Sequence, residues 1–192
     1  MSYFKDQYKN DIHFLANSDI PYLNEISAIE RINIIYSTAR KGRLNNNLCN
    51  RLWALLSQIH AETNLIPITK SNYDKFAKTY IKEIATIISI NQRLRLGVAQ
   101  KIFNLFMKDL WAWHCLNRRQ EKVLHFPLDR RILAFVRNNP WPAWTNIIAN
   151  QNTFDDSFAT YLNIQNILRD QMRHFNFDSP LALDQYLWHK FV

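Results

Sequence analysis

Hydrophobic residues recur every three or four positions along most of this chain, which is the spacing that places them on one face of an α-helix. Only two of the 192 residues are glycine, and the sequence contains no Asn-Gly or Asp-Gly pair that would signal a hairpin. These patterns predict an all-α protein of about eight helices.

Polar and proline-containing stretches mark where the helices should begin and end. A helix is expected over Pro21–Gly42, and the run Asn45-Asn46-Asn47 predicts the start of the next one. Ser71, with Asp74 three residues later, is similar to a capping box and predicts a helix start near residue 71. This helix is expected to end in the polar turn Asn91-Gln92-Arg93. Further helices are expected at residues 98–114, 128–137, 144–149, 155–173 and 180–190, with a charged loop at residues 117–122.

The composition favours one packed domain over a disordered chain. Hydrophobic residues make up 47% and aromatic residues 14% of the chain. No Gly- or Ser-rich linker divides it, so residues 1–192 are expected to form a single globular domain. The formal net charge of +8 favours a polyanionic partner, nucleic acid first and an anionic membrane second, although solubility alone would also account for it.

Several other classes of site are disfavoured. The two cysteines, Cys49 and Cys115, have no C-x-x-C spacing, and the six histidines have no metal-ligand spacing, so neither a metal nor a cofactor is expected. The N-terminal segment lacks the apolar run of a secretory signal, and no stretch reaches the ~18 apolar residues of a membrane span. We therefore expect a soluble, cytoplasmic protein.

Gly97 lies between two strongly helical segments, and residues 71–116 are therefore a candidate helix-hairpin-helix. A tight turn at Gly97 would leave the first amides of the second helix free to bind a DNA phosphate. An ordinary helix–helix corner with a solvated basic rim would produce the same pattern. The residues predicted to contact the DNA backbone are Arg93, Arg95, Gly97, Val98, Ala99, Arg130 and Arg131.

Residues 97–101, Gly-Val-Ala-Gln-Lys, resemble the hairpin of the helix-hairpin-helix DNA glycosylases, in which Gly-Val-Gly-x-Lys carries a catalytic lysine. Residues 126–130, Phe-Pro-Leu-Asp-Arg, are similar to the Pro-Val-Asp element that holds the essential aspartate of these enzymes. The resemblance implies that Lys101 is the nucleophile and Asp129 its acid/base partner. The chain departs from the pattern at Ala99, where the family commonly has its second glycine.

Two further segments resemble this superfamily. Residues 54–58 end in Gln58 and look like the early helix whose glutamine approaches the lesion or the opposite base. Residues 183–188 resemble the C-terminal Leu-Asp-x-x-x-Trp of the archaeal-type 8-oxoguanine DNA glycosylases. The resemblance implies that Gln58, Asp184 and Trp188 line the pocket for a flipped base, and that two helical lobes enclose the active site.

Excision of a base from a duplex requires the nucleotide to be extruded into such a pocket. Lys101 can attack the sugar only as a neutral amine, and a Schiff base formed there would permit strand cleavage by β-elimination, an AP lyase activity. The expected protein is a monomeric DNA glycosylase acting on double-stranded DNA with a modified base, 8-oxoguanine being favoured. The alternatives are removal of a hypermodified pyrimidine from phage DNA as a defence enzyme, a non-catalytic helical DNA-binding module, and a helical interaction protein with a solvated basic face.

Overall fold

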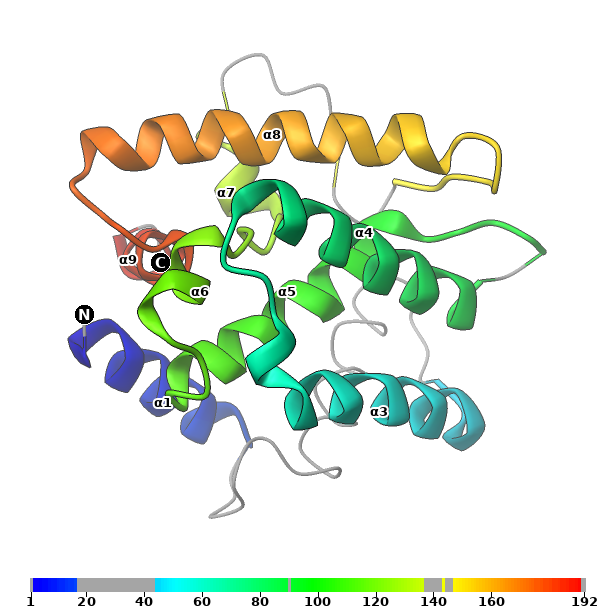
Figure 1. Cartoon of the computed structure of the whole chain (residues 1–192), viewed down its shortest axis with the longest axis horizontal. Coiled ribbons are helices and arrows are strands. Elements are labelled where there is room, and N and C mark those ends of the chain that lie inside the picture. Colours follow the sequence, from blue (N-terminus) through cyan, green and yellow to red (C-terminus); the bar gives the residue numbers. More distant parts are fainter. Residues whose placement is uncertain (1, 17–43, 90, 137–142, 144–146, 191–192) are drawn as a thin grey trace.

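The computed structural model describes residues 2–16, 44–89, 91–136, 143 and 147–190, and its regular structure is helical (Figure 1). Eight α-helices and one 3₁₀ turn in these residues confirm the predicted all-α class. The predicted helix over Pro21–Gly42 lies outside them. The elements are α1 (Ser2–Ala16), α3 (Asn46–Ala61), η1 (Thr63–Leu65), α4 (Lys70–Ile87), α5 (Leu96–Ala112), α6 (Arg118–Val123), α7 (Arg130–Leu133), α8 (Phe154–His174) and α9 (Pro180–Lys190).

Helix α5 lies at the centre of the described structure. It packs against α1, α3, α4 and α8, and every one of its residues except Leu105 is buried. Helices buried on all sides are normally apolar on all sides, and burying a polar group is costly unless it has a partner. The residues that bond to the buried polar side chains of α5 therefore show where polar groups are gathered inside the protein. These side chains are Gln100, Lys101, Asn104, Lys108 and Asp109.

The first and last described helices pack together beside α5 (Figure 1). Helix α1 contacts α5 and α9, whereas α8, which spans the top of the view in Figure 1, contacts α4, α5 and α9. Tyr8 of α1 and Leu187 of α9 belong to one cluster of buried hydrophobic side chains. The N-terminal helix is thus part of the core that surrounds α5.

The helix starts predicted at Asn45-Asn46-Asn47 and near residue 71 are both confirmed, but only the first has a side-chain cap. Asn45 is the N-cap of α3, and its side chain accepts a hydrogen bond from the Leu48 N–H. Helix α4 begins at Lys70 after Thr69, with no side-chain cap, so Ser71 is not its N-cap. The carboxylate of Asp74 pairs instead with Lys70 at 2.8 Å.

The turn before α5 does not use Gly97 as predicted. Asn91 (φ 49°) and Gln92 (φ 61°) take the left-handed conformation, whereas Gly97 is the second residue of α5 and has no positive φ. Its amide donates to the Ile147 carbonyl at 3.2 Å, and the Leu94–Ala149 bridge continues this contact. Glycine at position 97 therefore allows a close approach of residues 147–149. These residues are not helical, although a helix was predicted over residues 144–149; residues 144–146 lie outside the described part of the chain.

Two smaller elements also differ from the prediction. The expected charged loop at residues 117–122 is helix α6, because Asn117 and Gln120 form a complete capping box. The helix expected over residues 128–137 is reduced to the single turn of α7 in its described part. Helices α8 and α9 confirm the predicted helices at 155–173 and 180–190. Within the described residues, no helix has both the length and the hydropathy that crossing a membrane requires.

Candidate active site

Lys101 and Asp129 form a buried ion pair. Lys101 projects from α5, Asp129 is the N-cap of α7, and the Lys101 Nζ lies 2.5 Å from the Asp129 Oδ2. The second carboxylate oxygen accepts hydrogen bonds from the N–H groups of Arg131 (3.0 Å) and Ile132 (3.1 Å). The fold thus brings the two predicted catalytic residues into direct contact and fixes the aspartate through the helix that it caps.

The surroundings of Asp129 keep its carboxyl group ionised. Burial alone would raise the pKa of Asp129, but the charge and hydrogen bond of Lys101, together with the Ile132 and Arg131 amides, lower it below the usual value. At neutral pH the resting site therefore contains an ionised carboxylate in direct contact with the Lys101 side chain.

Two buried glutamines hold the segment that carries Asp129. The side-chain amide of Gln100 donates to the Leu128 carbonyl at 2.7 Å and accepts from the Leu128 N–H at 3.1 Å. Gln165 of α8 forms the same pair of bonds with Phe126, at 2.9 and 2.8 Å. Each glutamine satisfies both backbone groups of one residue, as a neighbouring strand would. Neither residue was identified from the sequence, although their burial requires this kind of partner.

A chain of buried polar groups continues from Gln100 toward the surface. Asn104 donates to the Gln100 Oε1 (3.1 Å) and to the Tyr161 hydroxyl (2.9 Å). The His125 ring lies 2.8 Å from that hydroxyl through Nδ1 and 2.9 Å from the Asp74 carboxylate through Nε2. A neutral ring with its proton on Nε2 fits this geometry, because it accepts from Tyr161 and donates to Asp74.

We expect protonation of His125 to weaken the fold in mild acid. Burial lowers the pKa of His125 to about 4, with Arg169 and Lys70 also lowering it and Asp74 opposing them. Below about pH 6.5 the His125 ring is protonated in the unfolded chain but stays neutral in the folded protein. The free energy of unfolding should therefore fall by roughly 3 kcal/mol between pH 6.5 and 4. Urea unfolding at several pH values measures this loss.

The exposed His174 on α8 offers a matched control for this pH dependence. His174→Gln should keep the slope of unfolding free energy against pH between 6.5 and 5, whereas His125→Gln should lose it. An unchanged slope in His125→Gln would mean that another group is responsible.

A second buried lysine–aspartate pair lies beside the first. Lys108 follows Lys101 by seven residues, about two turns along the same face of α5, and its Nζ lies 2.5 Å from the Asp184 Oδ2. Desolvation raises the pKa of Asp184; Lys108 lowers it, and the charge of Asp129 adds to the increase. The charges of Asp129 and Lys101 therefore act on Asp184, which joins the two pairs electrostatically.

The Asp184 Oδ1 is buried and has no hydrogen-bond partner in the described residues. Buried polar atoms without a partner are rare, so this oxygen marks a position where a ligand or an ordered water could donate a hydrogen bond. Lys108 also lies 4.4 Å from the centre of the Tyr8 ring, and the Tyr8 hydroxyl donates to Asp109 at 2.7 Å. Helix α1 therefore contributes to this part of the site, which the sequence did not indicate.

The other predicted pocket residues differ in position. Trp188 follows Asp184 by one turn of α9, is 36% exposed, and has the guanidinium of Arg131 4.1 Å from its ring centre. Gln58 is exposed on α3 and forms no hydrogen bond or ion pair with the other candidate residues in the described chain. The contacts thus connect Trp188 and Asp184 to the two pairs, and the role of Gln58 stays a prediction.

The predicted DNA-backbone contacts are only in part available. The Gly97 amide donates to Ile147 and the Ala99 amide to Arg95, so the prediction that these amides are free is wrong. Both residues and Val98 are buried in the first turn of α5. Arg93 and Arg130 are exposed, whereas Arg95 and Arg131 are half-buried.

No group of three or more His, Cys, Asp or Glu side chains in the described residues is placed to hold a metal ion. Comparisons of this chain with known protein families, curated proteins and solved structures gave no match. Inference about function therefore depends on the two lysine–aspartate pairs and their surroundings.

Proposed function

We propose that this protein is a DNA glycosylase that excises a flipped, modified base with Lys101 and Asp129. The observation that supports this most directly is the 2.5 Å contact between the Lys101 ammonium and the Asp129 carboxylate. The resemblance of the two segments that carry these residues to the helix-hairpin-helix glycosylases agrees with it. An oxidised purine such as 8-oxoguanine is the substrate that the resemblance favours.

The chemistry begins with transfer of a proton from the Lys101 ammonium to the Asp129 carboxylate, which leaves a neutral amine. The amine attacks C1′ of the extruded nucleotide, and the bond between C1′ and the base breaks. The base leaves with the bonding electron pair and takes up the proton that Asp129 received from Lys101. Opening of the sugar ring, with a proton passing from the lysine nitrogen to O4′, then gives a Schiff base on Lys101. Loss of a C2′ proton and departure of the 3′-phosphate by β-elimination cleave the strand.

Recognition of the flipped base would use the second pair and α9. The unpartnered Asp184 Oδ1 can accept a hydrogen bond from an N–H on the base edge, and Lys108 balances the charge of this carboxylate. Trp188 offers an aromatic surface for stacking, which flipped-base pockets require. The net charge of +8 would attract the DNA backbone and make binding weaken as salt increases.

The full chain should be incubated with duplexes that contain 8-oxoguanine, alkylated purines, uracil or hypermodified cytosines. We expect abasic sites or nicks with one of these bases, and covalent trapping on that duplex by borohydride, which reduces a Schiff base. Abasic sites without trapping would indicate that Asp129 activates water instead. Salt-dependent binding without release of any base would favour the non-catalytic DNA-binding module.

A further inference from the structure

Arg131 covers the aromatic side chain that a flipped base would need. Its guanidinium carbon lies 4.1 Å from the centre of the Trp188 ring, so the planar cation lies over the indole. The Nη1 of Arg131 is buried and has no hydrogen-bond acceptor in the described residues. Within the described part of the chain, this guanidinium thus contacts an aromatic face and forms no bond to a carboxylate.

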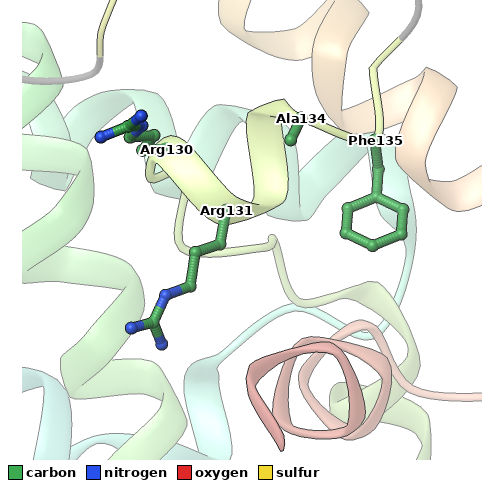
Figure 2. A pocket seen from close by; sticks show the side chains of 4 residues that line it. All are labelled: Arg130, Arg131, Ala134 and Phe135. Atoms are coloured by element: carbon green, nitrogen blue, oxygen red, sulfur yellow. The ribbon is translucent and has the colours of Figure 1, made fainter. Parts of the chain in front are cut away.

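A pocket of about 480 Å³ lies beside the same arginine and is lined by Arg130, Arg131, Ala134 and Phe135 (Figure 2). Arg131 and Phe135 extend from the α7 segment toward the same side in the view of Figure 2. Among the described residues, the lining holds two arginines and no carboxylate. Guanidinium groups bind phosphate oxygens in pairs of parallel, charge-assisted hydrogen bonds, so the two arginines of this pocket offer donors to a phosphate of the DNA backbone.

We propose that Arg131 exchanges partners when DNA binds. In the free protein its guanidinium stacks on Trp188, and in the complex it turns to a DNA phosphate in the pocket that it shares with Arg130. The exchange uncovers the indole face for the flipped base. This inference rests on the proposed glycosylase function, and it makes backbone binding a condition for stacking of the base.

The backbone geometry allows this exchange without disturbing the catalytic carboxylate. The Arg131 N–H donates to the Asp129 Oδ1 at 3.0 Å, so the main chain at residue 131 is fixed by the helix cap. Only side-chain torsions need to change for the guanidinium to leave Trp188. The bond between the Arg131 N–H and Asp129 is unaffected by that change.

The exchange can be followed by ¹⁹F NMR of the full chain labelled with 5-fluorotryptophan, with the Trp188 resonance assigned by Trp188→Phe. In the free protein, Arg131→Ala should move the Trp188 resonance, whereas Arg130→Ala should leave it in place. Arg130 is the matched control, because it lines the same pocket but does not stack on the indole.

A saturating amount of an unmodified duplex should then move the wild-type Trp188 resonance toward its position in free Arg131→Ala. Each arginine substitution should also lower the slope of log affinity against log salt by about 1, as expected for one lost phosphate contact. A Trp188 resonance that stays at its free position while the duplex is bound would overturn the exchange alone, even if bases are released from the substrate panel. Absence of any duplex binding at low salt would overturn the exchange and the proposed function together.

Discussion

Asp129→Asn is expected to slow base release by about 10²–10⁴-fold, the usual contribution of a positioned acid/base group, and to leave the start of α7 intact. The carboxylate has two roles, since one oxygen pairs with Lys101 and the other accepts the Arg131 and Ile132 amides. Asparagine keeps an oxygen for the amides and caps helices as well as aspartate does. It cannot take a proton from Lys101, so the substitution removes the chemistry and keeps the cap.

Substitutions of Lys101 complete this prediction. Lys101→Gln should abolish both base release and borohydride trapping, but it also leaves Asp129 buried without its cation. Lys101→Arg keeps a positive charge for that carboxylate and cannot form a Schiff base, because a guanidinium does not deprotonate in proteins. The arginine variant should therefore fold, bind DNA and release nothing.

The measurement is the single-turnover rate of base release on the duplex that the wild type cleaves, together with the unfolding midpoint of each variant. Lys78→Gln provides the control, since Lys78 is a surface lysine that pairs with Asp155 at 3.1 Å. Its rate should equal that of the wild type. Full activity in Asp129→Asn and in Lys101→Arg would remove both residues from the mechanism.

The helices with strong local signals could be predicted from the sequence. Asn45 marked the start of α3, and α8 was placed to within a residue because its apolar periodicity is regular. Helix α9 begins at the predicted Pro180, a residue that favours the first helical position. Helix α6 was predicted as a loop, although Asn117 and Gln120 have the spacing and residue types of a capping box. Its charged residues looked like a solvated loop, which shows that the cap was the better signal.

The turn before α5 was predicted from the polar run Asn91-Gln92-Arg93, but the role of Gly97 could not be, because it depends on a contact distant in sequence. Gly97 looked like a turn residue, but Asn91 and Gln92 supply the left-handed conformations and Gly97 admits the 147–149 segment. Polar residues such as asparagine tolerate that conformation at modest cost. Nothing in the local sequence indicates which segment approaches the first turn of α5.

A resemblance in short motifs predicted that Lys101 and Asp129 act together, and the fold places the two side chains in contact. The supporting residues were not predicted. Three polar side chains lie in segments whose sequence pattern predicts the hydrophobic core: Gln100, Gln165 and Lys108. Their roles depend on which backbone group or carboxylate the tertiary structure brings next to them. Sequence periodicity reports burial of a position but not the identity of its partner.

Lys108→Met is expected to destabilise the protein by about 3–5 kcal/mol, because it leaves the carboxylate of Asp184 buried without its cation. Both side chains are almost completely buried, with 2% and 1% of their surface exposed. The double substitution Lys108→Met with Asp184→Leu removes both charges and should recover most of the loss. Urea unfolding of the wild type, Lys108→Met, Asp184→Leu and the double variant gives the coupling energy between the two positions.

The exposed pair of Lys78 and Asp155 has the same chemistry and serves as the control, so Lys78→Met should cost no more than about 1 kcal/mol. Equal losses in Lys108→Met and Lys78→Met would contradict the burial of the Lys108–Asp184 pair.

The recovered double variant then separates the effect of the second pair on stability from its effect on recognition of the base. If the Asp184 Oδ1 accepts a hydrogen bond from the flipped base, this stable protein should still bind undamaged duplex with wild-type salt dependence and should release the base far more slowly. A double variant that releases the base at the wild-type rate would show that the second pair serves only the fold.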